Sequence, residues 1–323
     1  MTILVSDKQI RSQYSMSRCI EAVEEAFGAA GRDSFEVSER KVVAVEGGAR
    51  LLSLTAASAE LESLVAHVYS GAPAGHDKQR SPVNRRQKLY LVFDSATGAC
   101  EAIIGGEYLS WLKTGAMGAV AIKHLSSPTA EDLAVLGSGR QARAALAGAL
   151  EVRPFSRVRI WSRTRAHAAK MAEEFPQVPA IEISASAQEA VRGADVIVTA
   201  TTSTTPILLG DWLSPGCHVN AIGAHYPDHR ELDGEAVRRS TVVVDTHVAA
   251  RAEKGELLLA VKEGLFTFDE VAGELGEIVA GKSGWSRSEE ESTLFASCGS
   301  AIESLGAAWG VLAGMQEEDR FEF

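Results

Sequence analysis

The length, composition and charge of the chain restrict the class of protein. With 323 residues, the chain exceeds what one ordinary hydrophobic core holds and suits two domains. Hydrophobic residues make up 46% of the sequence and charged residues 23%, as in a globular protein. The formal net charge of −11 argues against binding to nucleic-acid phosphates or to an anionic membrane surface, because both need a basic protein surface.

The sequence also lacks the marks of secretion, membrane insertion and metal binding. It has no run of about 18 apolar residues, so we expect no membrane-spanning helix. The first residues lack a basic start followed by an apolar block, so we expect no signal peptide and a cytoplasmic location. The four cysteines form no C-x-x-C pair and have no histidine at metal-ligand spacing, which predicts free thiols and no metal site: Cys19, Cys100, Cys217 and Cys298.

The first region of the chain predicts an α+β domain. Apolar residues at helical spacing predict an amphipathic helix over residues 16–30. Runs rich in β-branched and aliphatic residues predict strands of a mainly antiparallel sheet, over residues 41–45, 51–54, 64–69 and 88–93. A polar and basic stretch predicts a loop over residues 70–86, a turn is predicted at 94–98, and a helix rich in small residues over 109–125.

From Glu131 onward, strands and helices alternate. The predicted strands cover residues 133–136, 158–161, 181–183, 196–199, 218–222 and 242–244. Helices are predicted between them, over residues 140–150, 166–175 and 188–192. This alternation is typical of α/β proteins with a doubly wound parallel sheet, the Rossmann architecture.

A last apolar helix, predicted over residues 300–315, can pack against the first domain. We therefore predict two domains, an α+β domain formed by residues 1–125 and 303–323 and a Rossmann domain formed by residues 126–302.

A G-x-G-x-x-A motif follows the first strand of the alternating region. Gly137 permits a tight turn, Gly139 lets the backbone approach a pyrophosphate, and Ala142 allows the next helix to pack closely on the sheet. The pyrophosphate would lie at the amino terminus of that helix, where backbone N–H groups are free. We predict that the motif binds a dinucleotide, and the alternative is a purely structural glycine turn: Gly137, Ser138, Gly139, Arg140, Gln141 and Ala142.

The end of the second strand indicates which dinucleotide binds. An NAD-binding protein usually offers a carboxylate there to the ribose hydroxyls, which would repel a 2′-phosphate. This chain has Ser162, Arg163 and Thr164 instead, and a guanidinium and two hydroxyls suit a phosphate. NADP is therefore the predicted cofactor and NAD the less favoured one. The alternative is that the arginine is only a solvated residue at the start of a helix.

Several segments together resemble the ornithine cyclodeaminase/μ-crystallin family. The similarity extends from about Arg40 to the last helix. It rests on the segments 137–142 (GSGRQA), 159–164 (RIWSRT), 193–201 (GADVIVTAT), 206–208 (PIL), 220–224 (NAIGA), 230–233 (RELD), 274–278 (ELGEI) and 295–301 (FASCGSA), and on Asp228.

This resemblance implies an NAD(P)H-dependent oxidoreductase that transfers hydride at the α-carbon of an amino acid or imino acid. That class includes ketimine or imine reductases and amino acid dehydrogenases. It also implies that the first domain binds the substrate and forms a homodimer through its sheet. Two alternatives stay open: an ornithine cyclodeaminase-like ammonia lyase, and a non-catalytic protein that binds NADPH and a small ligand, as μ-crystallin relatives do. The resemblance extends the cofactor site to later strand ends, at Thr199, Ala200, Thr201, Ile222, Gly223, Ser297 and Gly299.

In the resemblance, three basic positions hold the substrate carboxylate, and this chain departs from two of them. Arg40 keeps the first, but His67 stands where Lys is usual and Lys113 where a second Arg is usual. Lysine presents a point charge instead of a bidentate fork, and histidine is charged only part of the time near neutral pH. The site is therefore predicted to be less cationic than the family pattern. Alternatively, His67 is a hydrogen-bonded structural residue and Lys113 extends to the surface.

Asp228 follows the fifth predicted strand, just beyond its carboxyl end, where open α/β sheets bind their ligands. A carboxylate there can hold a substrate amine or iminium and handle its proton. We therefore predict Asp228 and Lys113 as catalytic residues. The alternative for Asp228 is the cap of a helix that begins near Glu231.

Overall fold

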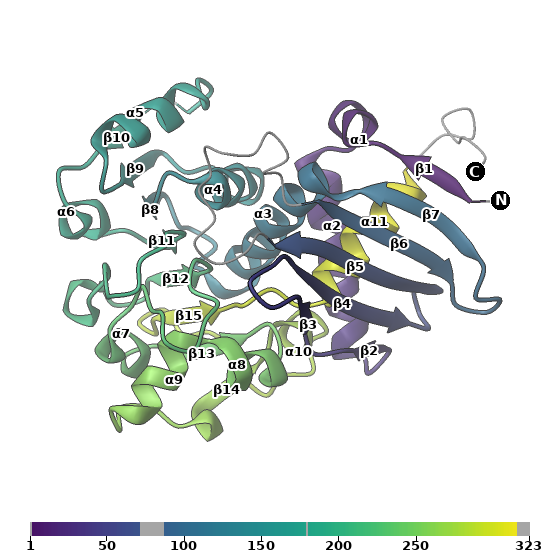
Figure 1. Ribbon diagram of the computed structural model, residues 1–323. Helices are drawn as coiled ribbons and strands as arrows, with labels where there is room; N and C mark the ends of the chain where they lie inside the picture. Colours follow the sequence, from purple (N-terminus) through teal and green to yellow (C-terminus); the bar gives the residue numbers. More distant parts are fainter. Residues whose placement is uncertain (1, 72–86, 179, 315–323) are drawn as a thin grey trace. The chain divides into compact units, whose positions relative to one another are not determined.

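The computed structural model describes residues 2–71, 87–178 and 180–314, and most of the loop predicted at 70–86 therefore lies outside the described residues. The chain divides into two compact units (Figure 1). Unit 1 comprises Met1–Lys113 and Ser300–Phe323, and unit 2 comprises Thr114–Gly299.

The described part of unit 1 forms a seven-stranded sheet in the order β1-β7-β6-β5-β4-β2, in which β3 also pairs with β4. All pairs are antiparallel except that of β1 with β7. The strands are β1 (Ile3–Val5), β2 (Phe35–Val37), β3 (Lys41–Ala44), β4 (Arg50–Ser58), β5 (Ser63–Gly71), β6 (Lys88–Asp94) and β7 (Cys100–Gly105). The four predicted strands are thus confirmed as β3 to β6, and β4 is longer than predicted.

Helices cover one face of this sheet. Figure 1 shows purple α2 and yellow α11 together behind strands β4 to β7, and α11 packs on both α2 and the sheet. The two helices approach closely because Gly306 has no side chain: a Cβ there would lie 2.6 Å from the Cβ of Ala26. The helices of this unit are α1 (Asp7–Gln13), α2 (Met16–Gly31), α11 (Ile302–Ala313) and the first part of α3 (Gly106–Leu125).

The opposite face of the sheet of unit 1 is apolar and partly exposed. Its central row runs across four strands, because Leu4 pairs with Ile103, Ile103 with Leu91 and Leu91 with Ala66. Leu4 is 41% exposed, and Leu89 in the next row is 44% exposed. Contiguous exposed apolar patches on a protein commonly mark a surface that binds another molecule.

The described residues of unit 2 form an eight-stranded sheet in which every pair is parallel. The strand order is β10-β9-β8-β11-β12-β15-β13-β14. The strands are β8 (Asp132–Leu136), β9 (Arg157–Trp161), β10 (Ile181–Ile183), β11 (Val196–Thr199), β12 (His218–Ala221), β13 (Thr241–Val244), β14 (Val271–Glu274) and β15 (Thr293–Ala296). The predicted Rossmann architecture and its six strands are confirmed.

Helices lie on both faces of the sheet of unit 2, as the doubly wound architecture requires. One apolar core lies between the sheet and helices α3, α4 and α5, and a second lies between the sheet and helices α6 to α9. The helices are α4 (Arg140–Val152), α5 (Arg165–Glu173), α6 (Ala187–Val191), α7 (Gly234–Arg238), α8 (His247–Glu253), α9 (Gly255–Lys262) and α10 (Leu275–Val279).

A series of buried hydrogen bonds connects α3 to the sheet of unit 2. Asn220 Nδ2 donates to the carbonyl of Gly118 at 2.8 Å, and its Oδ1 lies 2.9 Å from His218 Nε2. The other ring nitrogen of His218 lies 2.8 Å from Thr293 Oγ1. His218 is fully buried, and burial lowers its pKa from 6.5 to about 4. The imidazole is therefore neutral in the folded protein.

This burial makes stability depend on pH. Because the folded pKa lies below the unfolded value, the stabilisation is complete above pH 6.5 and is lost as pH falls toward 4. The free energy of unfolding should therefore fall by about 3 kcal/mol more in the natural protein than in a His218→Gln variant between pH 7 and pH 4. Urea unfolding of both proteins at several pH values measures this difference, and parallel pH profiles would contradict it.

Candidate functional site

The turn after β8 has the geometry that the G-x-G-x-x-A motif predicts. Gly137 has a φ of +130°, and a Cβ there would collide with the carbonyl of Ala200 at the end of β11. Its N–H donates to the carbonyl of Trp161 at 2.8 Å, which joins the turn to the end of β9. Where a Cβ would lie on Gly139, by contrast, there is no described atom within 4 Å. The turn therefore has no room for a side chain at Gly137, whereas the space beside Gly139 is open.

The motif continues into α4, whose first turn has no side-chain cap in the described structure. Ala142 is fully buried in the core between this helix and the sheet. Arg143 donates to the carbonyl of Ser138 and forms an ion pair with Glu174 at 2.7 Å. These contacts fix the backbone of the turn. Arg140 is exposed, and the buried Oε1 of Gln141 has no hydrogen-bond partner among the described residues. The amino end of α4 can therefore accept an anion.

The end of β9 lies beside this turn. Ser162 Oγ accepts a hydrogen bond from Ser138 Oγ at 2.8 Å. Arg163 and Thr164 are exposed, and Thr164 is the first residue before α5 but does not cap it with its side chain. Arg163 has neither an ion pair nor a hydrogen bond within the described part of the chain. The three side chains predicted to bind the 2′-phosphate thus follow the strand adjacent to the glycine turn.

The loops after β11 and β12 are held together by Glu231, a fully buried residue that sequence reasoning did not identify. One carboxylate oxygen accepts from Thr201 N at 2.6 Å and Thr201 Oγ1 at 2.7 Å. The other accepts from Thr199 Oγ1 and from Gly223 N, both at 2.9 Å. Gly223 leaves room for this carboxylate, since a Cβ there would overlap it. Of the cofactor residues predicted at these strand ends, Glu231 fixes three: Thr199, Thr201 and Gly223. Ala200 and Ile222 lie between them.

A buried cation and a second buried carboxylate lie next to Glu231. Lys254 is fully buried, and its Nζ donates to the carbonyls of Ala221 at 2.7 Å and Ser297 at 3.1 Å. Glu256 lies 3.2 Å from Lys254 and accepts from the N–H of Glu231. Burial is the largest single effect and lowers the pKa of Lys254, but Glu256, Cys298 and Glu231 together raise that pKa overall. Three buried charges therefore join the ends of β11, β12 and β15.

Asp245, at the end of β13, orders the loop that follows β15. It is fully buried and accepts from Ser297 Oγ and from Gly299 N, each at 2.8 Å. Ser297 and Gly299 were predicted from the family pattern, whereas Asp245 was not. Its position directly after a predicted strand was the available signal, because carboxyl strand ends meet at one edge of a parallel sheet.

Asp228 lies in the turn between β12 and α7, and its side chain is 84% exposed. Its Oδ1 lies 3.7 Å from His229 Nε2. The alternative that Asp228 caps a helix is wrong, since the cap of α7 is Asp233, which accepts from Ala236 N at 2.9 Å. Asp228 is thus an exposed carboxylate beyond the carboxyl edge of the sheet.

In unit 1, Lys113 has a buried partner. Its side chain is 9% exposed, so the alternative of extension to the surface is wrong. Its Nζ lies 2.8 Å from Glu303 Oε1 of α11, and Glu303 also accepts from Ser300 Oγ at 2.6 Å. The sequence places these partners 190 residues apart, so no local pattern links them.

His67 lies in the same buried cluster as Lys113. Its ring stacks on Tyr90 with centroids 4.1 Å apart, and its Nδ1 lies 3.3 Å from Ser304 Oγ. Burial, followed by the charges of Lys113, Lys88 and Arg40, holds the pKa of His67 well below its usual value. His67 is therefore neutral at physiological pH. The structure brings His67 and Lys113 together in unit 1 with Arg40 near enough to act on His67, while Asp228 belongs to unit 2.

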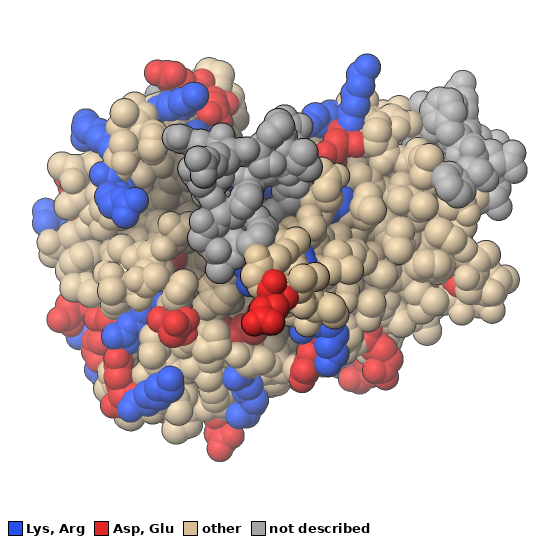
Figure 2. Space-filling model, in the orientation of Figure 1, with Lys and Arg blue, Asp and Glu red and all other residues tan. Residues whose placement is uncertain are grey.

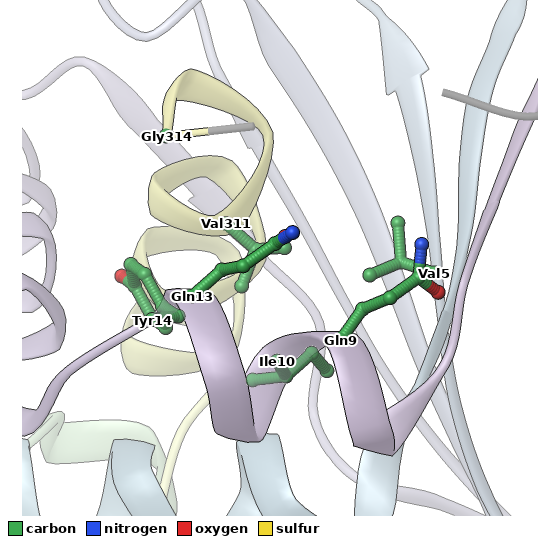
Figure 3. Close-up of a pocket in the computed structure, with 7 residues that line it drawn as sticks. All are labelled: Val5, Gln9, Ile10, Gln13, Tyr14, Val311 and Gly314. Atoms are coloured by element: carbon green, nitrogen blue, oxygen red, sulfur yellow. The ribbon is translucent and has the colours of Figure 1, made fainter. Parts of the chain in front are cut away.

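Other features of the described residues also bear on the kind of site present. The pocket in Figure 3, lined by Ile10, Tyr14, Val311 and neighbouring residues, has a volume of about 10 Å³, which is room for about one water molecule. No group of three or more metal-ligating side chains occurs in the ranges that the structure covers. The helices that can be described include none that is long and apolar enough to cross a membrane. Figure 2 shows acidic and basic side chains intermixed over the visible face.

A parallel sheet with a G-x-G-x-x-A turn at the point where its strand order reverses defines a Rossmann-type fold of dinucleotide-binding proteins. The family model of the ornithine cyclodeaminase/mu-crystallin family matches residues 1–319. The chain therefore belongs to this family, as the sequence resemblance indicated.

Relatives and solved structures agree with this assignment. The chain is 39% identical to the ketimine reductase mu-crystallin of Rattus norvegicus over 235 residues, which are 72% of this chain and 71% of the relative. It superposes on Thermococcus litoralis Δ1-pyrroline-2-carboxylate reductase, solved with NADH and L-proline, with a TM-score of 0.90, 31% identity and 99% of each chain covered. An archaeal alanine dehydrogenase dimer with bound NAD also gives a TM-score of 0.90, with 27% identity over 100% of this chain and 99% of that one.

The buried charges in unit 2 lead to a stability prediction. Lys254→Met would leave Glu231 and Glu256 buried without their cation, so the free energy of unfolding should fall by about 3–5 kcal/mol at pH 8. The loss should be smaller at pH 5, because burial raises the pKa of Glu231 and so favours its neutral form there. Chemical denaturation at both pH values checks this. A loss below 1 kcal/mol at pH 8 would show that the cation is not needed.

Proposed function

We propose that the protein is an NAD(P)H-dependent oxidoreductase that acts at the α-carbon of an imino acid or amino acid, as a ketimine or imine reductase or an amino acid dehydrogenase. The observation that carries the proposal is the glycine turn after β8, closed against Ala200 and open beyond Gly139. The ketimine reductase and the pyrroline-2-carboxylate reductase among its relatives support the reaction class. When bound, a nicotinamide supplies or accepts the hydride.

Residues of the chain would bind the cofactor, bind the substrate and transfer its proton. The N–H groups at the start of α4 bind the pyrophosphate, which the space beyond Gly139 admits. Glu231 holds Thr201 and Gly223 in the loops that receive the nicotinamide end. Arg40 and Lys113 bind the substrate carboxylate. Asp228 holds the substrate nitrogen and exchanges its proton, for which its exposed carboxylate is suited.

We also propose NADP as the preferred cofactor. A 2′-phosphate needs a cation and hydroxyl donors, and Arg163, Ser162 and Thr164 provide both directly after β9. The solved relatives named above contain NADH or NAD, so the assignment depends on Arg163 and on the missing acidic residue at this strand end. A cytoplasmic location is proposed from the four free thiols and the cofactor, and cell fractionation tests it.

A homodimer is proposed from the apolar face of the sheet of unit 1. Leu4, Ile103 and Leu91 form a continuous apolar row there, and Leu4 and Leu89 are more than 40% exposed. A second copy of the same face would cover this surface with matching chemistry. The dimer named for the archaeal alanine dehydrogenase is consistent with such an assembly.

The cofactor proposal predicts the effect of Arg163→Ala. NADPH should lose about 1.5–3 kcal/mol of binding free energy, because a charged hydrogen bond to the 2′-phosphate is removed, whereas NADH should lose much less. Calorimetric titration with both cofactors measures the two changes. Equal losses, or tighter binding of NADH by the natural protein, would overturn the NADP assignment.

The catalytic proposal predicts the effect of Asp228→Asn. The amide has nearly the same shape but cannot take a proton, so kcat should fall on the order of 100-fold or more while cofactor affinity changes little. A screen of cyclic imines and of 2-oxo acids with amines, followed by NADPH absorbance, supplies the substrate. Normal turnover by the variant would remove Asp228 from the mechanism. Ammonia release from ornithine without net cofactor use would favour the cyclodeaminase, and no turnover of any compound would favour the binding protein.

The dimer proposal predicts the effect of Leu91→Glu. A buried carboxylate in the middle of the apolar row should abolish association, since an unpaired charge cannot be accommodated there. Sedimentation velocity should show a dimer for the natural protein and a monomer for the variant, with an unchanged circular dichroism spectrum. A natural protein that sediments as a monomer would refute the proposal.

A further inference from the structure

The imidazole of His67 in unit 1 has one nitrogen with a hydrogen-bond partner and one without. His67 is 4% exposed, and its ring stacks on Tyr90. Its Nδ1 lies 3.3 Å from Ser304 Oγ, whereas its buried Nε2 has no hydrogen-bond partner among the described residues. A buried polar atom without a partner costs about 1–3 kcal/mol, so a water molecule or a ligand usually satisfies such an atom.

The hydroxyl of Ser304 determines which nitrogen of His67 carries the proton. Ser304 is 1% exposed, and its Oγ donates to the carbonyl of Ser300, four residues earlier, at 3.2 Å. A hydroxyl has a single proton, so Ser304 Oγ accepts from His67 Nδ1 while this bond is present. Nδ1 is therefore the protonated nitrogen, and Nε2 of the neutral ring is a hydrogen-bond acceptor.

The surroundings of His67 keep its ring neutral. Burial is the largest effect that holds the pKa of His67 well below its usual value, and the nearby Lys113 lowers it further. A lysine at this position could only donate hydrogen bonds, whereas the neutral histidine accepts one through Nε2. A carboxylate also only accepts, so it is a poor partner for Nε2, and an N–H group is a good one.

The first turn of α11 positions both substrate residues that the sequence predicted on β5 and α3. Glu303 is fully buried and accepts from Lys113 Nζ at 2.8 Å, and the next residue, Ser304, contacts His67. Glu303 also accepts from Ser300 Oγ at 2.6 Å, which fixes its own carboxylate. A cation and an acceptor held in this way match the two polar groups on the α-carbon of an amino acid, a carboxylate and a nitrogen that carries N–H bonds.

We propose that Ser304 fixes His67 as an acceptor and that His67 Nε2 binds an N–H group of the substrate nitrogen. The proposal rests on the proposed function for the nature of the ligand. It makes His67 a specificity-determining residue and Ser304 a positioning residue. A 2-oxo acid presents only an acceptor oxygen where an amino acid or iminium presents N–H, so the lone pair of Nε2 disfavours it. An ammonium or an NH2 iminium group has at least two N–H bonds, which leaves one for Asp228.

The position of the ring proton is tested without any ligand. In the natural protein labelled with ¹⁵N-histidine, ¹H–¹⁵N NMR at neutral pH should show His67 with a proton on Nδ1 and none on Nε2. Its signals are those that His67→Gln removes. Ser304→Ala should populate both tautomers, because the partner that selects one of them is lost. A proton on Nε2 in the natural protein, or an unchanged His67 spectrum in Ser304→Ala, would overturn the proposal.

The matched control for this spectrum is Ser12→Ala. Ser12 is an exposed serine of α1 whose Oγ donates to the carbonyl of Lys8, also four residues earlier and at 3.2 Å. Its loss should leave the signals of His67 unchanged.

The preference for N–H is tested with two cyclic acids that differ at one ring atom, L-proline and (S)-tetrahydrofuran-2-carboxylate. Calorimetric titration with NADPH present should give the natural protein a Kd for L-proline about tenfold lower or more. His67→Leu should raise the Kd for L-proline about tenfold and leave that for the oxygen analogue within about twofold. His67→Gln keeps an acceptor oxygen and should retain the preference for L-proline. Ser304→Ala should reduce this preference.

The proposed function and the histidine contact fail in different ways. If the natural protein reduces no imine but prefers L-proline, and His67→Leu loses that preference, the proposed function fails and the histidine contact stands. If the natural protein reduces imines but His67→Leu keeps the preference, or weakens both ligands equally, the histidine contact is overturned. Absence of binding of both ligands to the natural protein would also overturn it. If His67→Leu does not fold by circular dichroism, the NMR spectra of the natural protein and Ser304→Ala decide.

Discussion

The carboxylate of Glu231 is the interaction on which the rest of unit 2 depends. Parallel strands end at one edge of their sheet, and the loops that leave this edge have many backbone N–H groups without strand partners. Glu231 satisfies N–H groups of two such loops at once, at Thr201 and Gly223. A single buried anion thus sets the spacing between the ends of β11 and β12. The positive charge of Lys254, which pairs with Glu256 and binds carbonyls at the ends of β12 and β15, helps to stabilise this anion.

Unit 1 also contains buried ionisable groups, and there cations lie near a buried histidine. Burial, together with the nearby cations Lys113, Lys88 and Arg40, keeps the imidazole of His67 uncharged. Lys113 in turn lies 2.8 Å from the buried carboxylate of Glu303. In both units, a buried lysine is therefore held next to a buried carboxylate.

Sequence patterns predicted the features that depend on residues close together in the sequence. The alternation of strands and helices, the turn at Gly137 and the arginine after β9 all follow from residues within one supersecondary unit. The patterns did not predict β15, a run of four residues between polar loops that enters the sheet between β12 and β13. Nothing near residues 293–296 indicates their neighbours, because the pairing is non-local.

The same distinction between local and non-local contacts applies to the candidate site. Gly139 and Asp228 were predicted as site residues because a motif or a strand end marks them, whereas no pattern marked Glu231 and Asp245. Their roles arise from partners brought together by the fold, as when Glu231 binds the loop at Thr201, 30 residues earlier. The pairing of Lys113 with Glu303 has the same origin. Local sequence thus located the glycine turn, while tertiary contacts determine which charged groups surround Lys113 and His67.

The position of β15 has a consequence for how the chain is made. This strand lies between β12 and β13, yet it is the last strand of the sheet to leave the ribosome. Until residues 293–296 emerge, β13 and β14 have no place beside β12, and two strand edges stay open to wrong partners. The helix that follows, α11, belongs to unit 1 and covers its sheet, so that unit also needs residues 302–313. Both units therefore reach their final form only after these late segments have been made, and the growing chain must meanwhile be protected from aggregation.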